Sequence, residues 1–255
     1  DVALDPELLG RVFENLLASF NPETSSTARK ATGSYYTPRE IVDYMVDESL
    51  KGYLITHLTD VEEIDDKLAI LFSHEVEENP FTIKESKRIV NLIESVRVVD
   101  PAVGSGAFPM GILNRLVFLL HKVDRNNDFW KQAQIDTANQ FTDPKIKLEA
   151  IERINEYFKK NPNYGRKLFL IQKCIYGVDI QQIAVEIAKL RFFISLLVDE
   201  DVDKSKDNWG IEPLPNLDFK IMQGDSLISD FLGVSFELQK VPSENQGKLD
   251  FLDEK

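Results

Sequence analysis

The chain has 255 residues and a formal net charge of −13 at pH 7. This length suits one large domain, or one domain with a helical extension. The negative charge disfavours direct binding to nucleic acid, because lysine and arginine must neutralise the phosphates. Either nucleic acid is not the partner, or the basic surface lies elsewhere in a longer protein.

No apolar run approaches the ~20 residues that span a membrane. The single cysteine excludes an intramolecular disulfide framework and suits a cytoplasmic protein. With only three histidines beside it, we expect no bound metal.

The N-terminal part of the sequence predicts several helices. Asp5, Pro6 and an acidic first turn indicate a helix start, and its apolar face would consist of Leu9, Val12, Phe13, Leu16, Leu17 and Phe20. After a polar connection at 21–34, a second helix would begin at Thr37-Pro38-Arg39-Glu40, which also matches a capping box. Its inward residues would be Ile41, Val42, Met45, Val46 and Leu50. Residues 62–79 predict one helix and a loop, and residues 83–94 another helix.

A strand, a glycine turn and a helix follow one another at residues 96–120. Residues 96–99 are β-branched and apolar enough for a buried strand, and residues 107–120 read as a helix. Between them, Gly104 and Gly106 permit positive φ and the close approach of a ligand to the backbone. This order is typical of nucleotide-type pockets, in which the N–H groups of the helix face the ligand.

Asp100, at the end of that strand, indicates which ligand the loop takes. Its carboxylate would repel the pyrophosphate of a dinucleotide and would attract an ammonium group. The third glycine of the dinucleotide fingerprint is replaced by Pro109, which suits a first helical turn. The loop therefore favours a cationic nucleoside over NAD. S-adenosylmethionine, with an amino group and a sulfonium, fits that description.

The second half of the chain predicts two further strands. A polar, helix-prone insertion at about 126–164 precedes a buried strand at 175–179, and Cys174 would be a buried, inert thiol rather than a nucleophile. The helix expected at 181–197 would bury Ala184, Ile187, Ala188 and Phe192. A turn at 214–217 leads to a short strand at 219–222. Strands that alternate with helices predict an α/β fold with a parallel sheet and right-handed crossovers.

The three predicted strands are each followed by a carboxylate: Asp100, Asp179 and Asp225. Ligands bind at the carboxyl ends of the strands in an open parallel sheet, so these groups would converge on one edge. The second could accept hydrogen bonds from both ribose hydroxyls, and the third from the exocyclic amine of adenine. Simpler interpretations remain open, because Asp179 or Asp225 alone could be a helix N-cap. Tyr35 and Tyr36 alone could be core aromatics.

Together, these segments resemble a known family. They are Gly-Ser-Tyr-Tyr-Thr-Pro at 33–38, Asp-Pro-Ala-Val-Gly-Ser-Gly-Ala-Phe at 100–108, Gly-Val-Asp at 177–179, Pro-Asn-Leu at 215–217 and Gly-Asp-Ser-Leu at 224–227. In this order they are similar to the N-terminal, cofactor-binding half of adenine-N6 DNA methyltransferases. The closest likeness is to the Eco57I-like group of fused type II restriction–modification enzymes. It covers nearly the whole chain, from Asp5 onward.

The resemblance implies a Rossmann-like sheet, S-adenosylmethionine as the cofactor, and a role for each matching residue. The residues that would close over the methionine end of the cofactor are Tyr36, Thr37 and Pro38. Those that would form the floor beneath that end are Asp100, Pro101, Ala102, Gly104 and Gly106. Asp179 would bind the ribose and Ile180 would contact the adenine face. Asp225, with Ser226 beside it, would accept a hydrogen bond from the adenine amine.

One motif of that family is missing. The catalytic Asn/Asp-Pro-Pro-Tyr/Phe sequence holds the target amine and stacks the flipped base, and nothing after the Gly224-Asp225 strand matches it. Asn161-Pro162-Asn163-Tyr164 lacks the second proline and precedes Asp179, so we interpret it as a turn. We therefore expect no catalytic residue in this chain and no activity of the chain alone.

The sequence thus predicts the cofactor-binding fragment of a DNA adenine-N6 methyltransferase, since the chain begins at Asp1 rather than Met and ends in a polar run. A helical segment at 1–95 would carry Tyr-Tyr-Thr-Pro, and a partial, truncated Rossmann-like domain would occupy 96–255. DNA would be bound through parts of the protein that are missing here. The alternatives are methylation of RNA or protein on the same fold, or a non-catalytic scaffold. Asp100 and Pro109 disfavour an NAD-dependent enzyme.

Overall fold

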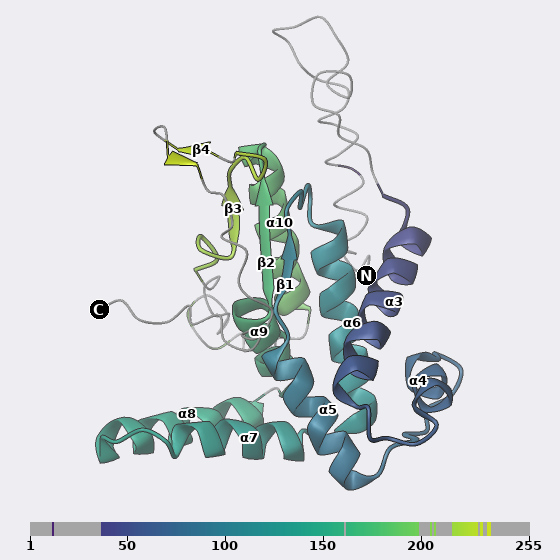
Figure 1. The fold of residues 1–255 in the computed structure, drawn as a ribbon. Helices are drawn as coiled ribbons and strands as arrows, with labels where there is room; N and C mark the ends of the chain where they lie inside the picture. Colours follow the sequence, from purple (N-terminus) through teal and green to yellow (C-terminus); the bar gives the residue numbers. More distant parts are fainter. Residues whose placement is uncertain are drawn as a thin grey trace, which may run out of the picture.

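The computed structural model describes residues 37–160, 162–198 and 216–228, together with residues 12, 205, 207, 230–231 and 234–235. The helix predicted at 5–20 (apart from Val12), the connection at 21–34, and Tyr35 and Tyr36 lie outside the described residues. Within the described residues, several helices pack beside and below a small parallel sheet (Figure 1). The predicted helix-rich α/β class is therefore confirmed.

The sheet of the described residues has three parallel strands in the order β1 (Val98–Asp100), β2 (Ile175–Asp179) and β3 (Ile221–Gln223). Val98 pairs with Ile175, and Gly177 pairs with Ile221. Because side chains alternate between the two faces of a sheet, Ile175, Gly177 and Ile221 are buried together. The carboxyl ends of all three strands lie at one edge, as predicted (Figure 1).

Two details of the predicted strands are wrong. Val99 is 64% exposed rather than buried, because it lies on the opposite face of the sheet from Ile175, Gly177 and Ile221, the face that also carries the exposed Met222. The third strand begins at Ile221 rather than at Phe219. The N–H groups of Lys220 and Ile221 both donate to the carbonyl of Leu217, at 2.9 and 3.0 Å, so the chain turns there before it becomes extended.

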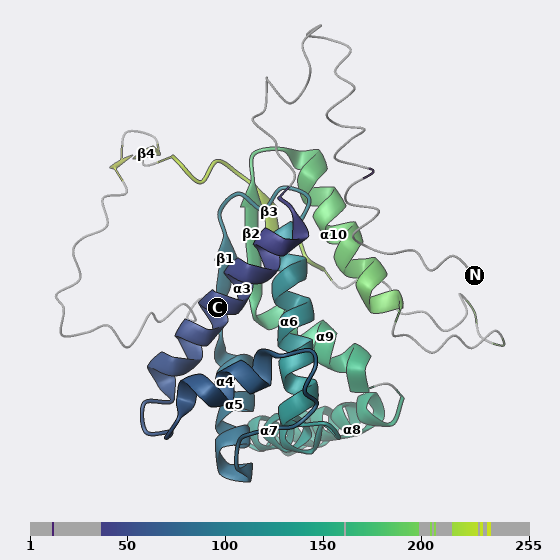
Figure 2. The ribbon, with the colours of Figure 1, turned by 90° about the vertical axis from the view of Figure 1, so that its right-hand side faces the viewer.

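Two long helices follow the first two strands and form much of the core. α6 (Ala107–Val123) and α10 (Gln182–Leu197) agree with the predicted helices. The residues expected to be buried on α10 are all buried: Ala184, Ile187, Ala188 and Phe192. Figure 2 shows α6 in the middle of the described helices, with the strands on one side and α10 on the other. The helix that carries the glycine turn is thus held from several directions.

Helix α3 (Arg39–His57) packs on α6 through a narrow stripe. Its buried residues are Val42, Val46, Leu50 and Leu54. Ile41 and Met45, also predicted to face inward, are 50% and 49% exposed, because they lie beside this stripe rather than on it. The two helices approach closely at Gly111 of α6, where an added Cβ would lie 2.6 Å from Cγ1 of Val42.

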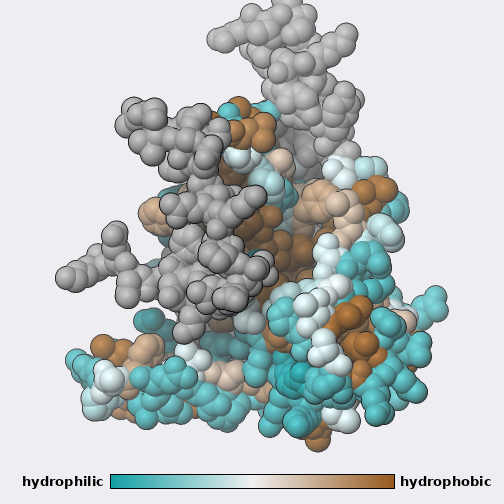
Figure 3. All heavy atoms as spheres, in the orientation of Figure 1, coloured by the Kyte–Doolittle hydropathy of each residue, from teal (hydrophilic) through white to brown (hydrophobic). Residues whose placement is uncertain are grey.

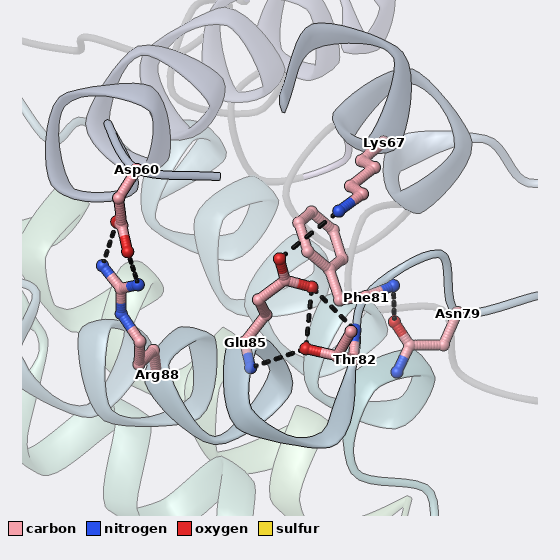
Figure 4. Close-up of polar contacts among 7 residues, drawn as sticks. All are labelled: Asp60, Lys67, Asn79, Phe81, Thr82, Glu85 and Arg88. Atoms are coloured by element: carbon pink, nitrogen blue, oxygen red, sulfur yellow. Dashed lines mark hydrogen bonds and ion pairs between the residues drawn. The ribbon is translucent and has the colours of Figure 1, made fainter. Parts of the chain in front are cut away.

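The capping box predicted at Thr37 is wrong. Pro38 occupies the N-cap position of α3, and no side chain caps that helix. A capping box forms instead at α5 (Ile83–Ser95), where Oγ1 of Thr82 accepts from the N–H of Glu85 at 3.3 Å and the carboxylate of Glu85 accepts from the N–H of Thr82 at 2.7 Å (Figure 4). The sequence pattern of a capping box therefore precedes both α3 and α5, but only α5 forms the box.

Figure 4 also shows how α5 is joined to α4 (Ile64–Phe72) and to the loop before it. Glu85 pairs with Lys67 of α4 at 3.3 Å. One turn further along α5, Arg88 donates to both carboxylate oxygens of Asp60, at 2.7 and 2.8 Å. These contacts fix the helices that lead into β1.

The predicted insertion is helical, as expected. α7 (Asp128–Ala138) and α8 (Pro144–Lys160) pack on each other, at the opposite end of the molecule from the carboxyl ends of the strands (Figure 1). Their surface is mostly hydrophilic (Figure 3), although the apolar side chains of Ile146 and Leu148 are exposed on α8.

Residues 162–164 are helical, in contrast to the turn predicted there. Helix α9 (Pro162–Lys173) begins at the first of them, and proline is well tolerated at a first helical position. Tyr164 is only 7% exposed and belongs to the hydrophobic core. A side chain held in this way is not available to stack on a base.

A short antiparallel pair, β4 (Asp230–Phe231) and β5 (Val234–Ser235), follows β3 and was not predicted. Among the described helices, none is both long and apolar enough to cross a membrane.

Candidate functional site

The glycine loop between β1 and α6 has the backbone conformation that its sequence predicts. Gly104 has φ of +51° and Gly106 has φ of +87°, values that residues with a side chain rarely adopt. Gly106 is the N-cap of α6 and also packs against α10, because an added Cβ would lie 3.1 Å from Cβ of Ala188. The loop is therefore both left-handed and closely packed, and both properties require glycine.

Asp179, at the end of β2, holds this loop. Its Oδ2 accepts from the N–H of Gly104 at 2.8 Å, and its Oδ1 accepts from the N–H of Gln181 at 2.9 Å. The N–H of Val103 donates to the carbonyl of Val178 at 2.9 Å. The loop thus lies directly on the end of the second strand, with the carboxylate of Asp179 between the loop and α10.

Asp100, at the end of β1, has an unusual environment. Its Oδ1 accepts from the N–H of Ala102 at 3.0 Å, whereas Oδ2 is buried without a hydrogen-bond partner in the described structure. Burial raises the pKa of Asp100; the Ala102 N–H lowers it, and the nearby Asp179 raises it. A buried carboxylate oxygen that lacks a donor costs free energy. An ammonium group or another donor at this position would satisfy it.

The third loop, after β3, is tied to the other two. Oγ of Ser226 donates to the carbonyl of Pro101 at 2.8 Å, and Nε2 of Gln223 donates to the carbonyl of Ile180 at 3.2 Å. The carboxylate of Asp225 is exposed, with Oδ1 accepting from the N–H of Leu227 at 2.9 Å. Within the described residues, the structure therefore brings the predicted positions from Asp100 to Gly106, Asp179, Ile180, Asp225 and Ser226 to one edge of the sheet.

An exposed apolar side chain lies beside the carboxylates of this edge. Ile180 is 65% exposed directly after β2, so its apolar side chain is accessible at this edge. It follows Asp179 in the chain, and its carbonyl accepts from Gln223, two residues before Asp225. The combination of an apolar surface with flanking acceptors suits a heterocyclic ring that carries amino groups.

The Tyr-Tyr-Thr-Pro segment is only partly described. Thr37 is half-buried and Pro38 is exposed at the start of α3, at the same end of the molecule as the glycine loop (Figure 1). Tyr36 lies outside the described residues. Among the described residues, Thr37 forms no hydrogen bond with the glycine loop, so its role near the ligand stays a prediction.

Sequence reasoning missed one residue of the site, Arg191 of α10. Its guanidinium Nη1 donates to the carbonyl of Ser105 in the glycine loop at 2.9 Å, and both residues are buried. Cys174, by contrast, is buried as predicted, and burial raises its pKa to about 11. A thiol with that pKa remains protonated at neutral pH and is a poor nucleophile.

Comparison with known proteins supports the resemblance found in the motifs. The family model described as Eco57I restriction-modification methylase matches residues 173–251, a range that contains Asp179, Ile180, Asp225 and Ser226. The chain is also 29% identical, over 235 residues, to a protein of Methanocaldococcus jannaschii whose name describes a type II restriction enzyme and methyltransferase. The alignment covers 89% of this chain and 17% of that relative. The predicted likeness to restriction–modification methylases is confirmed.

Proposed function

We propose that the edge formed by Asp100, Asp179 and Asp225 binds S-adenosylmethionine, and that the chain is the cofactor-binding part of an adenine-N6 DNA methyltransferase. The observation that carries the proposal is the buried Oδ2 of Asp100, which lacks a donor in the described structure. The amino group of the cofactor would give this oxygen a charge-assisted hydrogen bond. A pyrophosphate or another anion would instead raise the cost of burying the carboxylate.

The remaining donors of the cofactor match acceptors at the same edge. A carboxylate has about four lone-pair sites, and Asp179 uses two of them for Gly104 and Gln181. The other two suit the hydroxyls of a ribose. Asp225, which is exposed, would accept from the adenine amine beside Ser226. Ile180 would cover the adenine face.

The proposed architecture follows from this site. The order of the strands and the glycine loop after β1 support a Rossmann-like sheet at 96–255, preceded by a helical segment at 1–95. Thr37 and Pro38, with Tyr36, would cover the methionine end of the cofactor from the start of α3. Pro101 and Ala102 would form its floor with Gly104 and Gly106.

When bound, S-adenosylmethionine supplies an electrophilic methyl group. The residues of this chain would hold the cofactor in one orientation and keep its charged end out of water, which is a catalytic contribution of positioning and electrostatics. We place DNA binding and the Asn/Asp-Pro-Pro-Tyr/Phe residues in other parts of a longer protein. This view is supported by the name of the relative, of which the chain spans 17%.

Calorimetry tests the cofactor proposal directly. The chain is titrated with S-adenosylmethionine and with S-adenosylhomocysteine, and NAD serves as the control ligand. We expect both sulfur compounds to bind and NAD not to bind. A folded chain that binds neither sulfur compound would contradict the proposal and would favour a non-catalytic scaffold.

A longer protein that contains this chain tests the substrate. It is incubated with methyl-labelled S-adenosylmethionine and with duplex DNA, RNA or protein in parallel. We expect label at adenine N6 in DNA. Label in RNA or protein alone would retain the cofactor proposal and overturn the DNA substrate.

A further inference from the structure

A buried arginine of α10 contacts the backbone of the glycine loop. Arg191 is 3% exposed on α10, and its Nη1 donates to the carbonyl of Ser105 at 2.9 Å, although the two residues are 86 positions apart in the sequence. Burying a guanidinium is costly. Its buried neighbours on α10 are the apolar Ala188 and Phe192 and, one turn further, Ser195. The guanidinium therefore needs polar partners, and the carbonyl of Ser105 is one of them.

The Ser105 carbonyl needs a donor from outside α6. The first hydrogen bond of that helix runs from the N–H of Met110 to the carbonyl of its N-cap, Gly106, at 3.1 Å. Ser105 precedes the N-cap, so the helix supplies no N–H to its carbonyl. Arg191 supplies one from the neighbouring helix.

This contact is one end of a chain of hydrogen bonds across the loop. The peptide group that carries the Ser105 carbonyl also carries the N–H of Gly106, which donates to the carbonyl of Val103 at 2.9 Å. The carbonyl of Val103 and the N–H of Gly104 belong to the next peptide group. This N–H donates to Oδ2 of Asp179 at 2.8 Å. Two peptide groups therefore connect the guanidinium of Arg191 to the carboxylate of Asp179.

The charges at the two ends match the direction of the peptide dipoles. The cation lies at the carbonyl end of the chain and the anion at the N–H end, which is the arrangement that stabilises aligned peptide dipoles. Hydrogen bonds in such a chain also polarise one another in a poorly solvated interior. If the peptide group of Ser105 and Gly106 turned over, both of its bonds would be lost together.

We infer that Arg191 is a positioning residue, which fixes the glycine loop and, through two peptide groups, the carboxylate of Asp179. This inference rests on the proposed cofactor site, because Asp179 and the loop are the groups that would face the ligand. Arg191 itself contacts the backbone of the loop, so its effect on ligand binding would pass through the loop.

The test compares three variants of the chain: Arg191→Met, which removes the donor and keeps an apolar stem, Arg191→Lys, which keeps a charged donor, and Lys189→Met as the matched control. Lys189 lies on the same helix and pairs with Glu186 and Asp218 rather than with the loop. The first measurement is amide hydrogen exchange of Gly104 and Gly106 in the free chain. The second is the affinity for S-adenosylhomocysteine by calorimetry.

We expect Arg191→Met to exchange faster at Gly104 and Gly106 than the parent, with other amides of β2 unchanged, and to bind S-adenosylhomocysteine about tenfold more weakly, which corresponds to about 1.4 kcal/mol. Arg191→Lys should recover part of both properties, and Lys189→Met should behave as the parent. Should Arg191→Met not fold, Arg191→Gln takes its place. Parental exchange and affinity in the folded variant, or equal effects in Lys189→Met, would overturn the inference. If the parent chain binds no S-adenosylhomocysteine, the proposed function fails, whereas the exchange measurement still decides the role of Arg191.

Discussion

Asp179 holds Gly104 through a hydrogen bond of 2.8 Å from the backbone N–H to Oδ2 of the carboxylate. The side chain of Asp179, the last residue of β2, is thus hydrogen-bonded to the loop that follows β1. The simple interpretation of Asp179 as a helix N-cap explains the bond to Gln181, but it does not explain the bond to a loop 75 residues earlier. The geometry therefore links the proposed ribose acceptor to the conformation of the glycine loop.

Asparagine at position 179 should not restore the affinity for the cofactor that aspartate provides. Both carboxylate oxygens accept backbone N–H groups, so an amide keeps one acceptor and turns its NH₂ toward the other N–H. We expect Asp179→Asn and Asp179→Ala to weaken binding of S-adenosylhomocysteine by about tenfold or more, the effect of losing a charged hydrogen bond. Calorimetry on the folded variants measures this, with Asp136→Asn on exposed α7 as the control. Parental affinity in Asp179→Asn would refute the ribose assignment.

Asp100→Asn should weaken binding of S-adenosylmethionine without lowering the stability of the chain. Burial raises the pKa of Asp100, so the folded chain binds this proton more tightly than the unfolded chain does. The contribution of the group to stability is therefore present at acidic pH and is lost as pH rises through the raised pKa. Asparagine keeps an acceptor for Ala102 and buries no charge. We expect the variant to be as stable as the parent or more stable at pH 8, measured by urea unfolding, and to bind S-adenosylmethionine more weakly. Lower stability together with unchanged affinity would show that Oδ2 has a structural partner rather than a ligand.

Thr37→Ala distinguishes the two interpretations of the Thr37 segment. Because Thr37 does not cap α3, we expect the free energy of unfolding to change by less than about 0.5 kcal/mol, as for most substitutions outside caps and cores. As part of the proposed cover of the methionine end, the variant should still bind the cofactor more weakly. Thr37→Ser, which keeps the hydroxyl, should bind as the parent does. Equal affinities in both variants would leave Thr37 without a role in binding.

The parts of the site that follow from local chemistry could be predicted from the sequence. Positive φ at Gly104 and Gly106 and the carboxylates at the ends of β1 and β2 depend on residues that are adjacent in the chain. The contact of Arg191 with Ser105 could not be found in the same way, because it joins two distant segments. The position of Ser105 before the N-cap of α6 indicates only that its carbonyl needs a donor from outside that helix.

The capping boxes show why local patterns can mislead. Thr37 with Glu40 and Thr82 with Glu85 have the same spacing, yet only Thr82 forms the box. At the first site Pro38 becomes the N-cap, with φ of −56° and ψ of 145°, so the helix starts one residue later than the pattern requires. The burial of Ile41 and Met45 was misjudged for a similar reason, because which side of a helix is covered depends on its neighbours in space.

Glu94 of α5 should make stability depend on pH near neutrality. Its side chain accepts from Nε2 of Gln134 in α7 at 3.2 Å. Burial raises its pKa to about 7, although this hydrogen bond and the charge of Arg166 lower it; Asp124 adds a small rise. The folded chain therefore holds a proton that the unfolded chain releases above its ordinary pKa of 4.5. Stability from this group is complete at low pH and is lost as pH rises toward and through 7. The loss amounts to about 3 kcal/mol at most.

Glu94→Gln tests this dependence, because glutamine keeps the hydrogen bond and cannot ionise. Urea unfolding between pH 5 and pH 8 should show stability falling with pH in the parent and a flatter profile in the variant, which should be the more stable at pH 8. Glu85→Gln is the matched control on the same helix. Hydrogen bonds from the Thr82 N–H and hydroxyl and from Lys67 lower the pKa of Glu85, so this variant should be less stable than its parent by a similar amount throughout the range. Parallel profiles for the parent and Glu94→Gln would show that Glu94 is ionised in the folded chain across this range, and that α7 is held to α5 without its proton.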